Sequence, residues 1–403
     1  MPALLLSAGS EVVSVSLAEE LAACGVPFAL ISFGQNSVLA GVPELVAYER
    51  VEWPASSQSA LAAILRFASP LAERAGSALP VFATDDATLR LLLEHRSVVE
   101  HVLRIPRATA LRSGGLDKAE FFDFLRANGL ADLCPRSVTI RHPRELREAF
   151  DELGTDVVIK PTLKPFRAQL ALDTSGRKLL AASAYASPAE LSAALTANWS
   201  FSDAWLVQER LQTPPEGEAV AWVARSKHGQ IRQISAVERW KHPRVGGTGC
   251  WLETRVDPEI DLAGRRLAEA LGLEGLAEFP FLKDSSGAWR VLECNPRAWL
   301  QVALARIAGR PLAAFTWATL CDREANGNGF SQPPVQRTWI SAELLLLAAA
   351  SGNYGSRSSS FGTALGLLKR ADYTAMHSSP WGFVQRAWVR RVGGKLVRRT
   401  VGQ

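Results

Sequence analysis

The segment from Leu276 to Arg297 gathers polar side chains whose types suit metal binding. Two apolar strands are expected here, joined by the turn Asp284–Gly287, whose glycine can adopt the positive φ that tight turns often need. Side chains alternate between the two faces of a strand, so pairing of the two strands would bring several polar residues to one face. These are Glu278 on the first strand and Glu293, Asn295 and Arg297 on the second.

Two carboxylates, an amide oxygen and a guanidinium on one face predict a magnesium site. Mg²⁺ is usually held by one or two carboxylates and completes its octahedron with water and nucleotide phosphate. The expected ligands are Glu278, Glu293 and Asn295, with Mn²⁺ as an alternative ion, and Arg297 would lie beside them. Charged side chains are also common on exposed strands, so an ordinary surface hairpin is the alternative interpretation.

The run Glu293-Cys294-Asn295-Pro296-Arg297 resembles the E-[I/M]-N-P-R signature of the ATP-grasp superfamily. Glu278-Phe279 matches the place, about one hairpin upstream, of that family's first magnesium carboxylate. The resemblance implies that Arg297 stabilises the charge of a transferred phosphoryl group. Cys294 replaces the usual Ile or Met and faces away from the metal, where a small hydrophobe is a neutral replacement.

Three further segments match ATP-grasp motifs in the expected order. Asp117-Lys118 opens an amphipathic pattern and resembles the D-K-x-x-F entry, Val157–Pro161 resembles the V-[IV]-K-P strand, and Trp205–Leu211 resembles the hinge strand that reads the adenine. The resemblance implies that the two lysines meet the nucleotide phosphates and that a later carboxylate meets the ribose hydroxyls. The nucleotide-binding residues so implied are Lys118, Lys160, Gln208, Glu209, Leu211 and, on the ribose, Glu218.

Length and composition predict a folded chain of more than one domain. The 403 residues exceed one ordinary domain, and 47% hydrophobic with 21% charged residues is typical of globular proteins. The expected fold class is α/β (α+β). Residues 1–110 would form a Rossmann-like domain that precedes the ATP-grasp module, residues 111–330 the two-lobed ATP-grasp module with nucleotide, metal and catalysis, and residues 331–403 a small C-terminal helical region with a basic tail.

Residues 1–110 alternate short apolar segments with amphipathic ones, which favours a parallel sheet covered by helices. Strands are expected at Ala3–Ser7, Phe28–Ser32 and Val81–Ala83, and helices at Val12–Cys24 and Ser59–Ala75.

Asp85 and Asp86 follow the last of these strands, at the edge where a parallel sheet exposes its carboxyl ends. Ligands bind along such edges, but Asp is also a preferred N-cap, and capping of the next helix is the favoured role here.

Membrane insertion and disulfide bonding find no support in the sequence. The longest apolar run, Leu344–Ala350, is far shorter than the ~20 residues that span a bilayer. The first strand has no basic segment before it of the kind that opens a signal peptide, so a cytoplasmic location is expected. The five cysteines are odd in number and lack C-x-x-C spacing, which argues against both a disulfide framework and a zinc site.

The formal net charge of +5 is a property of the C-terminus. Residues 386–403 hold six basic and no acidic side chains, so the rest of the chain carries a charge of −1. No nucleic-acid partner is therefore predicted. The basic tail could touch an anionic membrane surface or an acidic partner, although a solvated segment packed by its own aromatic residues is favoured. A monomer or homodimer is expected.

The loop that follows Lys160 departs from the ATP-grasp pattern. The family often has a glycine-rich flap over the phosphates there, whereas this loop offers Lys164 and Arg167. Either these cations compensate, or the turn Ser175-Gly176 is the mobile tip of the flap.

A cluster of cations and glycines, Glu238–Gly249, lies between the ribose-binding region and the metal hairpin. Guanidinium groups match carboxylates and acyl phosphates bidentately, so these cations are predicted to hold an anionic substrate. A glycine-hinged surface loop with solvated cations is the alternative. The cations are Arg239, Lys241, Arg244 and, further on, Arg255; the expected catalytic residues are Arg297, Arg255, Lys241 and Arg244.

The resemblance implies an ATP-dependent carboxylate–amine ligase, most similar to the D-aspartate ligase and carbamoyl-phosphate-synthetase-like group. ATP would phosphorylate a small-molecule carboxylate, and an amine would attack the acyl phosphate to give an amide, ADP and phosphate, with an amino acid as one substrate. The alternatives are an acylation or carboxylation with a thiol, hydroxyl or bicarbonate-derived nucleophile, and a nucleotide-binding regulator without turnover.

Overall fold

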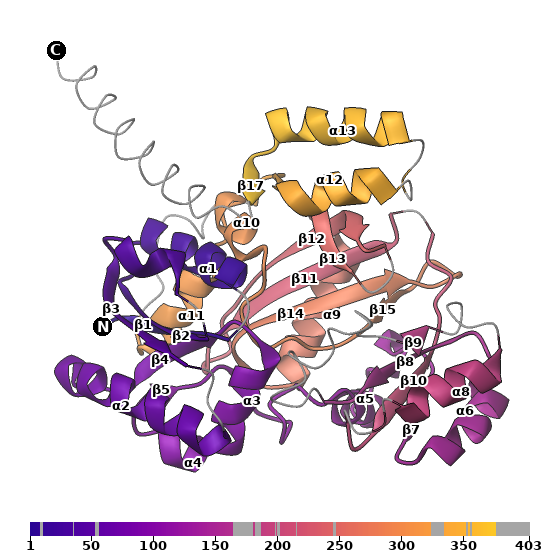
Figure 1. Ribbon diagram of the computed structural model, residues 1–403, viewed down its shortest axis with the longest axis horizontal. Coiled ribbons are helices and arrows are strands. Elements are labelled where there is room, and N and C mark those ends of the chain that lie inside the picture. Colours follow the sequence, from indigo (N-terminus) through magenta and orange to yellow (C-terminus); the bar gives the residue numbers. More distant parts are fainter. Residues whose placement is uncertain are drawn as a thin grey trace. The chain divides into compact units, whose positions relative to one another are not determined.

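The computed structural model describes residues 1–8, 11–34, 36–52, 56–163, 180–181, 187–197, 199, 202–214, 216–244, 247–323, 334–351, 354 and 357–375. The chain divides into two compact units, the first made of residues 1–239 and 253–336 and the second of residues 240–252 and 337–403. Helices and strands are mixed along the whole described chain (Figure 1), which confirms the predicted α/β fold class.

The first unit begins with a parallel sheet in the strand order β3-β2-β1-β4-β5. This is the order of a Rossmann-like layer, as predicted. All strands are parallel, and after β3 the chain crosses to the other side of β1 to add β4 and β5. The strands are β1 (Ala3–Ser7), β2 (Phe28–Phe33), β3 (Leu45–Val51), β4 (Leu79–Ala83) and β5 (Leu103–Arg104). Strand β3 was not predicted from the sequence, because this edge strand is half-exposed and carries Glu49 and Arg50 among its apolar residues.

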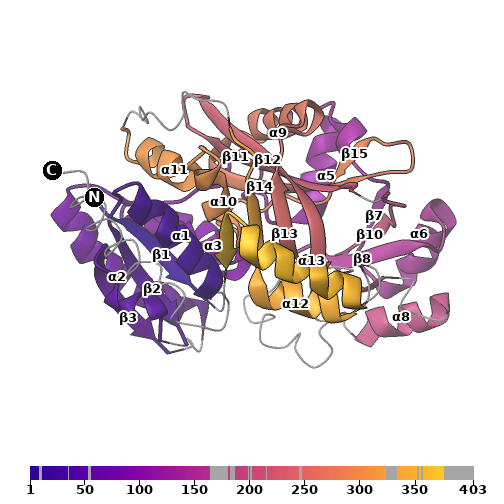
Figure 2. The same ribbon diagram turned by 90° about the horizontal axis from the view of Figure 1, so that it is seen from above.

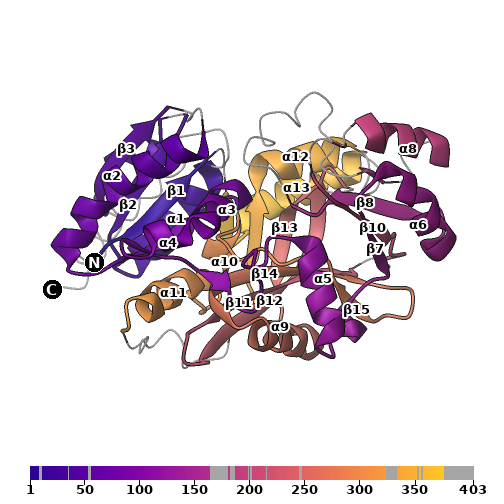
Figure 3. The same cartoon turned by 90° about the horizontal axis from the view of Figure 1, so that it is seen from below.

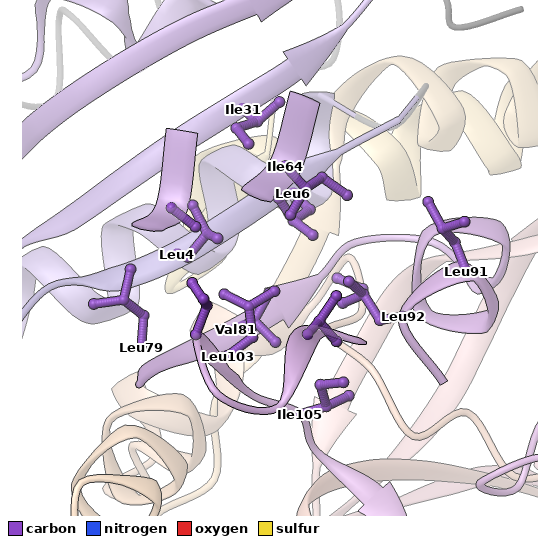
Figure 4. Close-up of a cluster of buried hydrophobic side chains, with 14 of the residues drawn as sticks. Leu4, Leu6, Ile31, Ile64, Leu79, Val81, Leu91, Leu92, Leu103 and Ile105 are labelled. Carbon is purple, nitrogen blue, oxygen red and sulfur yellow. The ribbon is translucent and has the colours of Figure 1, made fainter. Parts of the chain in front are cut away.

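Helices cover this sheet and close its core. They are α1 (Glu11–Ala23), α2 (Ser57–Ala75), α3 (Asp86–Glu94) and α4 (Arg96–Val99), with a short 3₁₀ helix η1 (Val38–Gly41). Ser56 and Ser59 form a capping box that begins α2, and Gly76 ends it with φ of +67°. Figure 4 shows the buried aliphatic cluster that the strands and helices share, with Leu4 and Leu6 of β1, Ile64 of α2 and Val81 of β4.

A second sheet is antiparallel and has the order β7-β10-β8-β9. Its strands are β7 (Ser137–Ile140), β8 (Val157–Pro161), β9 (Leu180–Ala181) and β10 (Trp205–Glu209); its helices are η3 (Pro143–Glu145), α6 (Leu146–Leu153) and α8 (Pro188–Ala197). One face packs against the helices through Ile159, Trp205 and Val207. Because side chains alternate, Lys160 and Gln208 lie on the opposite face.

The third sheet supplies the order β15-β14-β11-β12 within the first unit. Its strands are β11 (Glu218–Arg225), β12 (Ile231–His242), β14 (Leu273–Lys283) and β15 (Trp289–Val291), and β6 (Arg107–Ala108) pairs with the start of β14. Two helices, α5 (Lys118–Ala127) and α9 (Pro258–Ala270), share one apolar core with one face of this sheet (Figure 3). Gly264 lets α9 approach closely, since a Cβ there would lie 2.9 Å from the Cβ of Ala221.

Two helices after the third sheet, α10 (Val302–Ile307) and α11 (Leu312–Leu320), bond to α1 of the parallel layer. The backbone N–H of Ala303 donates to the Ser16 hydroxyl at 3.2 Å, and that of Ala313 donates to Glu20 Oε1 at 2.6 Å. These two hydrogen bonds hold the chain that follows the predicted metal hairpin against the N-terminal layer. Elsewhere in the first unit, the short 3₁₀ helix η2 (Ala131–Leu133) follows α5.

The second unit contains residues 240–252, which are the end of β12 and most of β13 (Thr248–Thr254). It also contains β16 (Thr338–Ser341), α12 (Ala342–Ser351), α13 (Arg357–Arg370) and β17 (Tyr373–Ala375). Helices α12 and α13 lie side by side (Figure 2), and β16 pairs with β17 in parallel. The core holds Trp240, Cys250, Ile340, Leu345 and Ala364. None of the described helices is long and apolar enough to cross a membrane. The basic tail, 386–403, lies outside the described residues.

Candidate active site

The predicted hairpin is present, and its turn is built by Asp284. The Oδ1 atom of Asp284 accepts hydrogen bonds from the backbone N–H groups of Ser286 (2.9 Å) and Ala288 (3.0 Å). Gly287 has φ of +86°, the left-handed conformation that glycine adopts without strain. The turn therefore forms for the reason that the sequence predicts.

The second strand ends earlier than predicted, because the pairing slips by one residue. Phe281 pairs with Val291, but Glu278 pairs with Asn295, so Glu293 and Cys294 together stand opposite one residue, Phe279. This is a β-bulge, an irregularity that re-aims side chains. The backbones of Glu278 and Asn295 still exchange two hydrogen bonds, at 3.0 and 2.9 Å, and so the two residues lie directly opposite each other.

Three of the predicted residues converge, and they are called here the carboxylate cluster: Glu278, Glu293 and Asn295. The amide Nδ2 of Asn295 lies 3.4 Å from Glu278 Oε2 and 3.3 Å from Glu293 Oε1. Burial raises the pKa of Glu278 to about 7, against a hydrogen bond from Trp222 and the charge of Arg297, which lower it. A carboxyl group in such surroundings is stabilised in its charged form by a bound cation.

Two lysines from different sheets meet this cluster. Asp117 caps α5 by accepting from the N–H groups of Ala119 (2.8 Å) and Glu120 (3.2 Å), which places Lys118 in the first turn. Lys118 Nζ lies 3.3 Å from Glu293 Oε2, and Lys160 Nζ, at the end of β8, lies 3.4 Å from the Leu292 carbonyl oxygen.

Lys160 is electrostatically coupled to the same residues. Burial lowers the pKa of Lys160 to about 8; the charge of Glu293 acts in the opposite direction and that of Lys118 in the same direction. Lys118 of α5 and Lys160 of β8 therefore interact electrostatically, both beside the carboxylate cluster.

Arg297 binds a residue of the N-terminal layer. Its Nε donates to Asp86 Oδ1, and both side chains are largely buried, at 17% and 16% exposure. Burial alone would lower the pKa of Arg297, but the carboxylates of Asp86, Glu278 and Glu293 raise it above its usual value. Asp85 caps α3 by accepting from the Thr88 N–H at 2.8 Å, as predicted, whereas Asp86 is the partner of Arg297.

The residues assigned to the adenine lie at the hinge, in differing surroundings. Gln208 is 2% exposed, shares a sheet face with Lys160, and its Nε2 atom has no hydrogen-bond partner within the described part of the chain. Glu209 accepts the Arg136 N–H at 2.8 Å and so holds β7 against β10. Leu211 is half-buried in the connection that follows. A nucleotide contact fits Gln208 better than the Glu209 side chain.

Glu218 opens β11 on the same sheet face as the carboxylate cluster. It stands opposite Leu282, and Trp222 stands opposite Glu278, so side-chain alternation puts Glu218, Trp222 and Glu278 on one face. Glu218 is half-buried.

The cations assigned to the substrate fall in different units. In the second unit, the Lys241 N–H donates to the Tyr354 hydroxyl at 2.7 Å, and the Arg244 guanidinium lies 5.3 Å from the centre of the Tyr354 ring. In the first unit, Arg255 is exposed, and Arg239 is paired with Glu253 (2.9 Å) and Glu216 (2.6 Å). A role for Lys241, Arg244 and Arg255 in substrate binding stays a prediction.

The residues of the predicted phosphate flap lie outside the described part of the chain: Lys164, Arg167 and the turn Ser175-Gly176.

Three residues beside the cluster were not predicted from the sequence: Trp222, Trp299 and Glu238. Trp222 Nε1 donates to Glu278 Oε1 at 3.1 Å, and its ring stacks on that of Trp299, with centres 5.6 Å apart and planes 15° apart. The charge of Glu238, on β12, also raises the pKa of Glu278. The available signal was strand alternation, since Glu218, Trp222 and Glu278 fall on one face once β11 pairs with β14.

The carboxylate cluster fits a hard divalent cation that keeps part of its coordination for other ligands. Two carboxylates and an amide oxygen are the number and type of ligands that Mg²⁺ takes from a protein when water and phosphate complete the octahedron. Within the described ranges, no group of three or more His, Cys, Asp or Glu side chains could hold a metal by itself.

A cavity of about 350 Å³ lies elsewhere in the first unit, between α4, β5, β6 and the end of α11, and none of the candidate residues lines it. Its charged groups are paired with one another, as in Arg104 with Asp322 at 2.7 Å and Arg96 with Glu100 at 3.1 Å. This cavity is therefore a groove between packed elements whose charged side chains form ion pairs with one another.

Neither a family model nor a curated protein matches this chain, but solved structures do. An N5-carboxyaminoimidazole ribonucleotide synthetase in complex with ADP is 16% identical, with a TM-score of 0.62 over 85% of this chain and 81% of that one. The biotin carboxylase of Campylobacter jejuni is 14% identical, with a TM-score of 0.61 over 83% and 74%. An L-amino acid ligase from Bacillus licheniformis is 13% identical, with a TM-score of 0.61 over 84% and 79%.

These similarities establish the fold. The chain has the ATP-grasp fold, as the motif resemblance implies, and the likeness covers most of the chain.

Proposed function

We propose that this protein is an ATP-dependent carboxylate–amine ligase. The observation that carries the proposal is the convergence of Lys118, Lys160 and Arg297, from three separate elements, on Glu278 and Glu293. Three cations around two carboxylates and an amide give a site for a polyphosphate and its metal ion, and the surplus of charged groups at one buried point serves no packing purpose.

In this proposal the nucleotide lies between the two antiparallel sheets. Lys118 and Lys160 hold the phosphates, Gln208 and the backbone near Glu209 and Leu211 read the adenine, and Glu218 binds the ribose. Glu278, Glu293 and Asn295 hold Mg²⁺, or Mn²⁺, which neutralises phosphate charge when bound. The related carboxylase domain from Hydrogenobacter thermophilus was solved with MgADP, and the synthetase above with ADP, which supports this choice of ligands.

The chemistry follows from what a carboxylate needs before an amine can attack it. Oxide is a very poor leaving group, so the substrate carboxylate first attacks the γ-phosphorus of ATP, the bond to the β-phosphate oxygen breaks, and ADP leaves. The amine then attacks the acyl carbon, phosphate departs, and the ammonium proton passes to solvent. The protein's part is positioning and charge stabilisation, with Lys118, Lys160 and Arg297 arranged before the reaction.

The substrates are a small carboxylate and an amine, one of them an amino acid. The Bacillus licheniformis neighbour, named as an L-amino acid ligase, supports this choice. Lys241, Arg244 and Arg255 are proposed to hold the substrate carboxylate.

A screen of ADP release tests the proposal. Purified protein with Mg²⁺ and ATP is incubated with pairs of carboxylates and amino acids, and hydroxylamine is added to trap an acyl phosphate as a hydroxamate. ADP and a hydroxamate that depends on one carboxylate are expected. Formation of AMP and pyrophosphate would mean an adenylate intermediate and would contradict the mechanism, and no nucleotide turnover with any pair would favour a regulator.

Carboxylation is the second candidate, because two of the neighbours are named as a carboxylase and a carboxyaminoimidazole synthetase. The same screen separates it from the first: ADP release that depends on bicarbonate, and not on a carboxylate substrate, would replace the ligase proposal.

Arg244→Ala and Arg255→Ala test the substrate side. Loss of a bidentate anion contact should raise the KM for the identified carboxylate, with ATP affinity unchanged. If instead ATP affinity falls and the carboxylate KM stays the same in both variants, these arginines belong to the nucleotide side of the site.

A further inference from the structure

Pro280 occupies a position where a strand normally has a donor. It lies within β14, which pairs with β11 on one side, where Pro280 stands opposite Val220, and with the hairpin's second arm on the other. Proline has no N–H, so inside sheets it is confined to edges, strand starts and bulges. The only irregularity near Pro280 in the described hairpin is the bulge at Glu293 and Cys294, directly beside the carboxylate cluster.

The missing donor leaves one carbonyl without its ladder partner. In an antiparallel sheet, the residues of a hydrogen-bonded pair exchange two bonds. The Leu292 N–H donates to the Pro280 carbonyl at 2.8 Å, but the return bond, from residue 280 to the Leu292 carbonyl, cannot form. The atom that approaches this carbonyl is Lys160 Nζ, at 3.4 Å, from a strand of another sheet.

We propose that Pro280 is a positioning residue for Lys160. By withholding an N–H, Pro280 leaves the Leu292 carbonyl to Lys160, whose ammonium is thereby held beside Glu293 in the orientation that nucleotide phosphates require. The inference rests on the proposed function, in which Lys160 binds those phosphates.

Physical chemistry gives this arrangement a purpose. A buried ammonium group needs acceptors, and a lysine has several rotatable bonds that must be fixed when it binds a phosphate. A carbonyl with free acceptor capacity supplies both a partner and an orientation before the nucleotide arrives, so less order has to be created on binding. A non-proline residue at 280 would pair with Leu292, and the ammonium would have to share the carbonyl or leave it.

The test is a double-mutant cycle measured as ADP affinity, by calorimetry with Mg²⁺ and without turnover. Pro280→Ala should weaken ADP binding roughly three- to tenfold, and Lys160→Met should weaken it more. In the double variant, the loss should equal that of Lys160→Met alone, because Pro280 acts only through Lys160. Losses that multiply, or an unchanged affinity in Pro280→Ala, would overturn the inference.

Hydrogen exchange supplies a readout that does not depend on nucleotide. In Pro280→Ala, the new amide at 280 should be strongly protected, since the inference requires it to bond the Leu292 carbonyl. A rapidly exchanging amide there would show that the carbonyl is not the contested acceptor. If Pro280→Ala does not fold, Pro280→Val, with better strand propensity, takes its place in both measurements.

Two controls separate this inference from its neighbours. Phe281→Leu perturbs the same strand from its apolar face and keeps every donor, so it should lower stability and leave ADP affinity within about twofold of the wild type. If Lys160→Met itself binds ADP as tightly as the wild type, the nucleotide role of Lys160 fails. If Lys160→Met binds weakly but Pro280→Ala does not, only the role of Pro280 fails.

Discussion

Glu278 of β14 is a half-buried carboxylate and Glu20 of α1 a buried one, and loss of solvent raises the pKa of each, to about 7 and about 8 respectively. Their partners differ. Glu20 accepts the backbone N–H groups of Ala313 (2.6 Å) and Ala314 (3.3 Å), at the start of α11. Glu278 accepts a hydrogen bond from Trp222 Nε1 and lies near the charges of Glu238, Glu293 and Arg297.

This difference teaches which feature marks a site. A raised pKa is common to both glutamates, so it distinguishes nothing here. Glu20 meets fixed backbone donors and no second carboxylate in hydrogen-bonding range among the described residues, which is the arrangement of a structural cap. Around Glu278, like charges are held together by surrounding cations, an arrangement that costs stability unless a ligand completes it.

Glu293→Gln should have the largest effect on turnover. Gln keeps the shape, but it removes the charge that pairs with Lys118 at 3.3 Å and would bind the metal. The expected loss in kcat is about a thousandfold or more, with the midpoint of thermal unfolding little changed because this side chain is 27% exposed. ADP formation over a range of Mg²⁺ concentrations measures it. Full activity with ordinary Mg²⁺ dependence would remove Glu293 from the metal site.

Asp86→Asn should have the second largest effect, because it releases Arg297 from its carboxylate partner. A guanidinium that is no longer fixed should lower kcat by about a hundredfold and leave the KM for ATP nearly unchanged. The matched control is Asp85→Asn, the same change one residue away, since Asn also caps helices and Asp85 accepts hydrogen bonds from Thr88 at the start of α3. Equal effects of the two changes would assign the loss to the helix α3 and not to Arg297.

The sequence predicts much of this site because its motifs are local. Asp117 caps α5 and so places Lys118, and the turn at Asp284 closes the hairpin that brings Asn295 opposite Glu278; each depends on nearby residues. The parallel layer was likewise predictable from its buried apolar strands, except for the polar edge strand β3.

The rest of the site depends on pairing between distant segments. Asp86 meets Arg297 across 211 positions of the chain, and Trp222 meets Glu278 only because β11 pairs with β14 in one register. No local pattern carries that information. The missing return hydrogen bond from position 280 to the Leu292 carbonyl follows from residue type, but only after the register is known.

Trp222→Phe should have a smaller effect, because it removes one donor from Glu278 and keeps an aromatic ring on Trp299. Loss of one hydrogen bond of about 1 kcal/mol predicts several-fold weaker Mg²⁺ binding and a similar fall in turnover. Trp299→Phe is the matched control, since the Trp299 Nε1 has no partner within the described part of the chain. If both variants lose the same activity, the stack matters and the bond to Glu278 does not.

Glu20→Gln should leave turnover unchanged near neutral pH and alter only how stability depends on pH. The folded-state pKa of about 8 exceeds the ordinary value of 4.5, so between these pH values the folded chain keeps a proton that the unfolded chain releases. The favourable contribution of this proton is complete below pH 4.5 and is lost as the pH rises through 8. Between pH 5 and pH 9, the free energy of unfolding of the wild type should therefore fall by on the order of a few kcal/mol more than that of Glu20→Gln. Denaturant unfolding at the two pH values measures this difference. Glu73→Gln, at an exposed position of α2, is the control. Parallel pH profiles for wild type and Glu20→Gln would mean that α11 relaxes around the charge, and loss of turnover would place Glu20 with Glu278 after all.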